Sequence, residues 1–153
     1  MTMPSFLERF ESQVDRTPEA CAVTFEGAEL SYAELDRRAN ALAHQLMSRG
    51  VGPDTLVAIS SERSLELAVA VVAVLKAGGA YLPLDPNYPA ERLTFMLEDS
   101  RAALLLKQAG LKLPGEAGLP VIELHPGQPS GDEATLVRPA RRTLPTHLAY
   151  AIY

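Results

Sequence analysis

The sequence contains one cysteine, Cys21, and no tryptophan. A single cysteine cannot form a disulfide within the chain, nor a cysteine-based metal site on its own. The composition therefore favours a reducing compartment and predicts a cytoplasmic protein. Cys21 lies in an apolar, strand-like stretch, so we expect its thiol to be a core side chain rather than a nucleophile.

Long hydrophobic runs and a basic excess are also missing. The most apolar stretch, Leu67–Leu75, is far shorter than the ~20 residues that a membrane span needs. The first four residues, Met1–Pro4, lack the basic and apolar segments of a signal peptide. The net charge is -5, and the pairs Arg37-Arg38 and Arg141-Arg142 are isolated in the sequence. We therefore expect neither a membrane nor a nucleic acid as partner.

The general catalytic motifs are absent. The sequence has no glycine-rich dinucleotide fingerprint, no phosphate-binding loop ending in Gly-Lys-Ser/Thr, and no nucleophile elbow around Ser60 or Ser61. His44, His125 and His147 are far apart and show no metal-ligand spacing. We therefore predict that the chain itself supplies no catalytic residue, no cofactor-binding residue and no metal ligand.

Hydrophobic periodicity alternates between helical and strand-like segments. Helices are predicted over Ser5–Arg16, from Ser31 to Gly50, over Leu65–Ala77 and from Pro89 onward. Strands are predicted over Ala22–Phe25, Glu29–Ser31, Leu56–Ile59, Tyr81–Leu84, Ala102–Leu106, Val121–Leu124 and Leu148–Tyr153. This order predicts an α/β fold, with a parallel sheet and covering helices. The helix over Leu65–Ala77 is apolar on nearly every face, so we expect it to be packed on more than one side.

Three stretches resemble core motifs of the amino-acid adenylation domains of nonribosomal peptide synthetases. Leu30–Leu35 (LSYAEL) is similar to the first motif, and Leu75–Pro86 (LKAGGAYLPLDP) is similar to the second nearly letter for letter. Leu148–Tyr153 (LAYAIY) resembles the strand that leads into the third motif, where that family has a phosphate-binding loop. The order and the spacing of the motifs also agree.

The residues of these motifs can also be interpreted in purely structural terms. Ser31 and Glu34 fit a capping box, in which each side chain binds the backbone N–H of the other residue. Gly78 and Gly79 suit a sharp turn from helix to strand, and Lys76 in the last helical turn complements the helix dipole. We therefore expect the second motif to act as scaffold rather than to contact a substrate.

The resemblance implies that residues 1–153 are an incomplete adenylation domain, the first α/β layer of its large N-terminal subdomain. The parent would bind ATP with Mg²⁺ and an amino acid, form the aminoacyl adenylate, and load the phosphopantetheine of a carrier. Its expected partners are the remainder of the domain and the peptidyl carrier and condensation domains of an antibiotic or siderophore synthetase. Because the family's catalytic residues lie downstream, we expect this chain to be inactive alone.

Other functions stay open. An acyl- or aryl-CoA ligase belongs to the same superfamily, although the run Ala80–Pro86 favours the peptide synthetases. A non-catalytic interaction module could keep this scaffold without an active site. A nicotinamide-binding Rossmann domain would need the glycine fingerprint that the sequence lacks.

Overall fold

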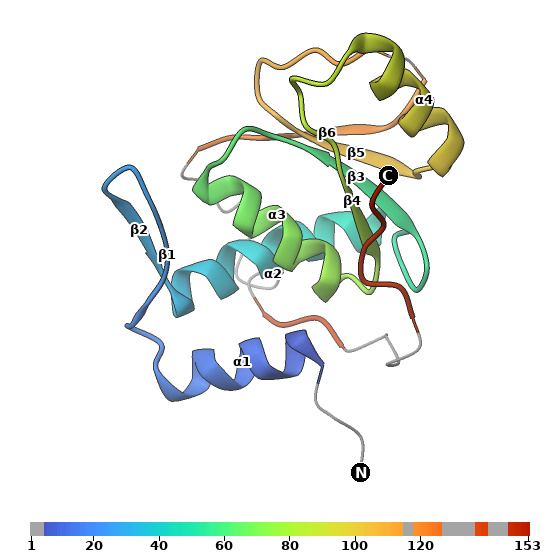
Figure 1. The fold of residues 1–153 in the computed structure, drawn as a ribbon. Coiled ribbons are helices and arrows are strands. Elements are labelled where there is room, and N and C mark those ends of the chain that lie inside the picture. Colours follow the sequence, from blue (N-terminus) through green and yellow to red (C-terminus); the bar gives the residue numbers. More distant parts are fainter. Residues whose placement is uncertain (1–4, 115–117, 127–136, 141–146) are drawn as a thin grey trace.

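The computed structural model describes residues 5–114, 118–126, 137–140 and 147–153 (Figure 1). The helices are α1 (Phe6–Arg16), α2 (Tyr32–Ser48), α3 (Leu65–Lys76) and α4 (Ala90–Ser100). The strands are β1 (Cys21–Phe25), β2 (Ala28–Ser31), β3 (Leu56–Ser60), β4 (Ala80–Pro83), β5 (Leu104–Gln108) and β6 (Val121–Leu124). Every element predicted before residue 125 is present and in the predicted order. The pair Arg141-Arg142 lies outside the described residues.

The central sheet has four parallel strands in the order β4-β3-β5-β6, which confirms the predicted α/β class. Helix α3 connects β3 to β4, and α4 connects β4 to β5. Figure 1 shows α2 and α3 on one face of this sheet and α4 on the other. The two faces are covered because each strand places alternate side chains in two different cores. Val57 and Ile59 of β3 pack toward α2 and α3, whereas Ala58 packs toward α4.

Helix α3 is packed on more than one side, as predicted. Its buried side chains include Val69, Val72 and Val74, and they share one core with residues of α1, α2 and the sheet. Leu67 and Val71 are only partly buried and line a hollow of about 660 Å³ beside α1 and β1. The apolar circumference of α3 is therefore covered over most, but not all, of its surface.

The strand expected over Leu148–Tyr153 is wrong in extent. Only Tyr150 forms a parallel bridge, to Tyr81 of β4, through hydrogen bonds of 3.0 Å from Tyr81 N–H to Ala149 C=O and from Ala151 N–H to Tyr81 C=O. The next backbone N–H that β4 could offer on this side would belong to residue 83. That residue is Pro83, which has no N–H. The ladder therefore stops after one bridge.

The expectation that Cys21 is a core residue is also wrong. Cys21 is exposed in β1, which pairs with β2 in a separate two-stranded antiparallel sheet. A two-stranded hairpin has a solvent-facing side, and the strand-like sequence pattern does not say which side a terminal residue will occupy.

Helix α2 begins as the sequence predicts, but its capping box is only half formed. The Ser31 hydroxyl accepts a hydrogen bond from Glu34 N–H at 3.1 Å. The Glu34 carboxylate instead accepts hydrogen bonds from Arg38 at 2.9 Å and from Arg37 at 3.4 Å. One helix-start donor is thus satisfied by Ser31, and Glu34 acts in ion pairs along the helix.

Replacing Ser31 by alanine removes this cap, and we expect a loss of ~0.5–2 kcal/mol in the free energy of unfolding. Urea titration followed by circular dichroism measures it. Ser12→Ala is the matched control, because Ser12 is exposed inside α1 and an alanine there should be neutral or slightly stabilising. Equal effects of the two substitutions would contradict the capping role.

The turn from α3 into β4 needs glycine at two successive positions, for a different reason at each. Gly78 has a φ of 89°, in the left-handed region that favours glycine. Gly79 has an ordinary φ, but a Cβ there would lie 2.8 Å from Val51 Cγ1 and 3.1 Å from the Thr55 carbonyl oxygen. The turn therefore requires backbone freedom at one position and close packing at the next.

For Gly79→Ala we expect a destabilisation of about 1–3 kcal/mol from overpacking, measured by chemical unfolding. Combining it with Val51→Ala should cost less than the sum of the two single changes, because the nearest clashing methyl group is then gone. Strict additivity would show that the contact with Val51 is not the cause.

Candidate functional site

The carboxyl ends of the parallel strands meet at one edge of the sheet, where open α/β folds commonly bind ligands. The loops that follow β3 and β4 line a hollow of about 480 Å³ at this edge. The C-terminal residues Ile152 and Tyr153 line the same hollow. This edge is the candidate functional site, and its parts come from segments far apart in the chain.

A buried hydrogen bond joins the ends of β3 and β4. Ser60 is 0% exposed, and its hydroxyl donates to the Leu84 carbonyl oxygen at 2.9 Å. The Leu84 N–H in turn donates to the Ile59 carbonyl oxygen at 2.9 Å. The Ser60 hydroxyl is thus used to fix two strand ends, which is a structural role rather than that of a free nucleophile.

The loop after β3 is tied to β5 by Gln108. The Gln108 side-chain oxygen accepts hydrogen bonds from Glu62 N–H at 3.0 Å and from the Ser61 hydroxyl at 3.4 Å. Ser64 then caps α3 by accepting from Leu67 N–H at 3.2 Å. These contacts hold the backbone of the loop, so its shape is set by the sheet beneath it.

The loop after β4 has its own turn. The Asp85 carboxylate accepts a hydrogen bond from Asn87 N–H at 2.9 Å, and the Tyr88 N–H donates to the Asp85 carbonyl oxygen at 3.1 Å. The Arg92 guanidinium lies 4.6 Å from the centre of the Tyr88 ring. The Leu-Asp-Pro run that ends the second motif therefore forms a stiff rim of the hollow. That this run acts as scaffold rather than contacting a substrate stays a prediction.

The C-terminal residues are attached to α4. The Tyr153 hydroxyl donates to the Asp99 carboxylate at 2.7 Å, and the Tyr153 ring meets Phe95 edge to face with centroids 6.1 Å apart. Partial burial, the hydrogen bond to Asp99 and the Asp99 charge raise the pKa of the Tyr153 phenol above its ordinary value. Sequence periodicity missed this contact because the two residues belong to separate elements.

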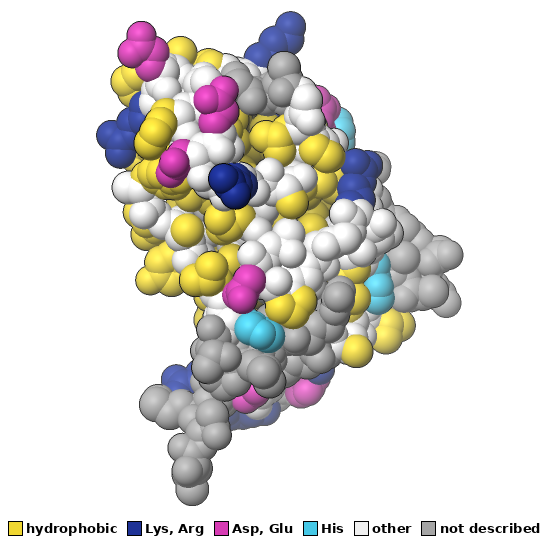
Figure 2. Space-filling model, turned by 90° about the vertical axis from the view of Figure 1, so that its right-hand side faces the viewer, with side chains coloured by type: hydrophobic (Ala, Val, Ile, Leu, Met, Phe, Trp, Pro, Cys, Tyr) yellow, Lys and Arg dark blue, Asp and Glu magenta, His cyan; other side chains and the backbone are white. Residues whose placement is uncertain are grey.

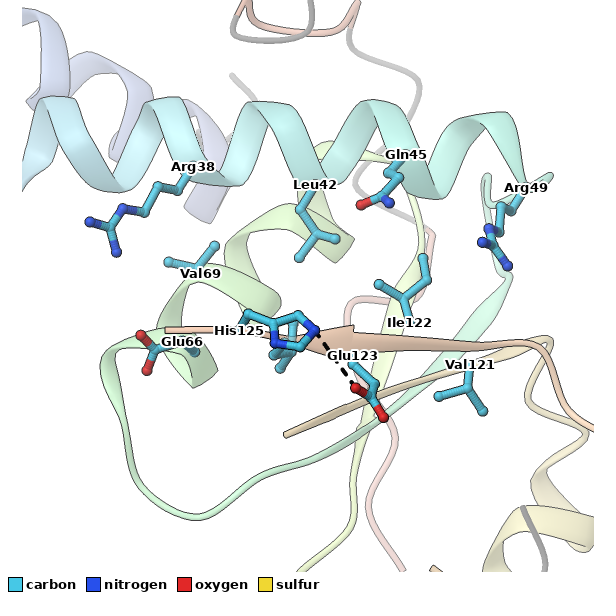
Figure 3. A pocket seen from close by; sticks show the side chains of 11 residues that line it. Arg38, Leu42, Gln45, Arg49, Glu66, Val69, Val121, Ile122, Glu123 and His125 are labelled. Carbon is cyan, nitrogen blue, oxygen red and sulfur yellow. Dashed lines mark ion pairs between the residues drawn. The ribbon is translucent and has the colours of Figure 1, made fainter. Parts of the chain in front are cut away.

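A second hollow, of about 360 Å³, lies between α2 and the edge strand β6 (Figure 3). Arg38 and Gln45 of α2, and Arg49 directly after this helix, line one side of the hollow, and β6 lines the other. The His125 Nε2 lies 3.6 Å from a Glu123 oxygen on the opposite wall. Basic and acidic side chains both line this hollow, so it has no strong preference for one charge.

The histidines are separated in space as well as in sequence. His44 Nε2 lies 2.7 Å from the Val137 carbonyl oxygen, whereas His125 is exposed beside Glu123. Among the described residues, no group of three or more His, Cys, Asp or Glu side chains could hold a metal ion. The assignment of no catalytic, cofactor-binding or metal-binding residue to this chain stays a prediction.

A family model described as "AMP-binding enzyme" matches residues 10–153. The chain belongs to the AMP-binding enzyme family. Within this family it is 48% identical to tyrocidine synthase 3 of Brevibacillus parabrevis over 94% of its length, and 44% identical to a dimodular nonribosomal peptide synthase of Bacillus subtilis (strain 168) over 95%. It spans only 2% and 6% of those two proteins.

Solved structures of peptide synthetases share the fold. The chain superimposes on the nonribosomal peptide synthetase FmoA3 with a TM-score of 0.86 and 35% identity, over 98% of this chain and 16% of FmoA3. The N-terminal subdomain of Klebsiella oxytoca NpsA gives a TM-score of 0.72 and 26% identity, over 80% of this chain and 32% of that one. The chain thus has the α/β layer of the N-terminal subdomain of adenylation domains.

Several exposed apolar side chains of this family member lie at the candidate site. Tyr88, Ile152 and Tyr153 line the hollow, and Phe95 of α4 contacts the Tyr153 ring. Exposed Leu148 lies at the opposite end of the sheet, where its N–H donates to the Asp54 carboxylate at 2.9 Å. Figure 2 shows hydrophobic side chains interspersed with charged ones on the side of the molecule that is at the right of Figure 1. In the described ranges, no helix combines the length and apolarity needed to cross a membrane.

Ser60→Ala should destabilise this edge by about 1–3 kcal/mol, because the Leu84 carbonyl oxygen loses a buried donor. Equilibrium unfolding in urea measures the loss. The neighbouring Ser61→Ala is the control, since that hydroxyl is less buried, and we expect a change within about 0.5 kcal/mol. A larger effect at Ser61 than at Ser60 would contradict this description of the edge.

Proposed function

We propose that the chain is the first α/β layer of an adenylation domain that activates an amino acid for a nonribosomal peptide synthetase. The parent protein would join ATP and the amino acid to form an aminoacyl adenylate and pyrophosphate. It would then pass the acyl group to the phosphopantetheine thiol of a carrier domain. ATP with Mg²⁺ would be its cofactor, and a peptidyl carrier and a condensation domain would be its partners.

The observation that carries this proposal is the second motif in its three-dimensional setting. Leu75–Pro86 forms the end of α3, the glycine turn and all of β4, and it delivers the chain to the carboxyl edge of the sheet. Relatives at 44–48% identity over nearly the whole chain are peptide synthetases. Likeness in both sequence and fold over the same residues supports a shared role.

The described site favours a supporting role for this layer. Ser60 and Gln108 at the carboxyl edge use their side chains for hydrogen bonds within the scaffold. Exposed apolar side chains of Tyr88, Ile152 and Tyr153 line the hollow at that edge, and exposed Phe95 of α4 packs against Tyr153. Such a surface fits the remainder of the domain, which would complete the substrate site.

The nearest alternative is an acyl- or aryl-CoA ligase of the same superfamily. One NpsA subdomain structure, 26% identical to this chain, is a complex with 3-hydroxybenzoyl-AMSN. NpsA is itself described as the adenylation part of a peptide-synthetase di-domain, so its aryl ligand bears on the acid and not on the acceptor. The identity of 44–48% to tyrocidine synthase 3 and the dimodular synthase favours an amino acid. A non-catalytic module would share the fold but would not support adenylate formation.

The isolated chain should catalyse no amino-acid-dependent exchange between ATP and pyrophosphate. A chimera that joins it to the downstream part of a related adenylation domain should catalyse exchange, because positioning and charge neutralisation then act in one complete site. The assay is run with the standard amino acids, aryl acids and fatty acids, with coenzyme A as a second acceptor.

The downstream part alone is the control, and circular dichroism establishes that each protein is folded. Exchange by the isolated chain would contradict the scaffold role. Thioester formation on coenzyme A with aryl or fatty acids, and none with amino acids, would favour the ligase. A folded chimera that activates none of these acids would favour the non-catalytic module.

A further inference from the structure

A buried lysine joins three helices that are far apart in the sequence. Lys76 lies in the last turn of α3, and its side chain is 0% exposed. Its Nζ lies 2.5 Å from a Glu11 oxygen of α1 and 2.7 Å from an Asp36 oxygen of α2. The same Nζ lies 5.6 Å from the centre of the Phe10 ring. One ammonium group therefore contacts both helices that pack on α3.

These carboxylates depend on the lysine charge. Asp36 Oδ1 is buried, and the Lys76 ammonium at 2.7 Å compensates for its loss of water. Burying an ion is costly unless an opposite charge lies beside it. The sequence predicted only that Lys76 complements the helix dipole, because neither carboxylate is near it in the chain.

Arg138 contacts the same two carboxylates, Glu11 and Asp36, from the outer side of the cluster. Its guanidinium lies 2.9 Å from an Asp15 oxygen, 3.3 Å from an Asp36 oxygen and 3.7 Å from a Glu11 oxygen. It also donates to the Glu11 carbonyl oxygen at 3.3 Å. In Figure 1, residues 137–140 lie next to α1 and α2. Arg138 thus binds a distant segment to both helices.

Helix α1 has few other means of attachment. It is 11 residues long, and only Leu7, Phe10 and Val14 of its side chains are buried. A helix of this length is marginal in water without tertiary contacts. The cluster of Glu11, Asp15, Asp36, Lys76 and Arg138, here called the latch cluster, is therefore a substantial part of what holds it.

We propose that the latch cluster is a conformational device: Lys76 and Arg138 share carboxylates of α1 and α2, so α1 and residues 137–140 dock and release as one unit. Two cations face three carboxylates, and Asp36 touches both cations. Loss of one partner leaves charge uncompensated at the others, which couples the two segments. The device concerns docking within this layer and does not depend on the proposed function.

The first test is Arg138→Ala, which keeps buried Lys76 intact and should leave the chain folded. We expect amide hydrogen exchange in the second half of α1 to become about ten- to a hundredfold faster, while β3 and β5 are unchanged. Arg37→Ala is the control, because exposed Arg37 pairs with Glu34 outside the cluster. Unchanged exchange in α1, or equal acceleration in α1 and the sheet, would overturn the proposal.

The reciprocal test loosens α1 without altering a charge. Val14→Ala removes buried apolar contact from α1. Because coupling acts equally in both directions, we expect exchange of the Arg138 side-chain Nε–H, followed by NMR, to become about tenfold faster. If that signal keeps its wild-type exchange rate while α1 loosens, the two segments dock independently and the proposal fails.

Acid provides a third measurement. The hydrogen bond from Arg138 lowers the pKa of the Asp15 carboxyl below its ordinary 3.8. The pair therefore stabilises docking above that value, and its contribution is lost as the pH falls through the lowered pKa. In Arg138→Ala the Asp15 titration midpoint should return toward 3.8. An unchanged midpoint would show that Arg138 and Asp15 are not paired in solution.

Discussion

Burial of the central strands on both faces is the constraint on which the rest of this structure depends. Val57, Ala58 and Ile59 of β3 are each at most 2% exposed, and Leu104, Leu105 and Leu106 of β5 are buried to the same degree. A parallel strand in this position needs a helix on each side. Helices α2 and α3 cover one face and α4 covers the other, so the helical connections between the strands must run over both faces of the sheet. That path places the loops after β3 and β4 together at the carboxyl edge.

The second motif meets several structural requirements within one short run of residues. Lys76 neutralises carboxylates from two other helices, Gly78 allows the turn, and Gly79 lets the chain pass against Val51. Leu82 and Leu84 then enter the core beneath α4. A run with this many simultaneous packing demands tolerates little change, and these demands alone give a physical reason for its close resemblance to a family motif.

Polar side chains at the candidate site hold the scaffold together. Ser60, Gln108 and Asp85 use their hydrogen bonds to hold strand ends and turns in place. Residues 148–153 reach the same edge through the Tyr150 bridge and the contact between Tyr153 and Asp99. A rigid platform of this kind is what precise positioning of reactants requires.

Local patterns were sufficient to predict the order of helices and strands, the cap at Ser31 and the glycine turn, because each depends on residues that are neighbours in the sequence. Other features required the tertiary structure. The exposure of Cys21 depends on which face of the hairpin is covered, and the last strand is cut short because Pro83 of another strand lacks an N–H group. The partners of Lys76 come from two other helices, and periodicity carries no information on which charges folding will bring together.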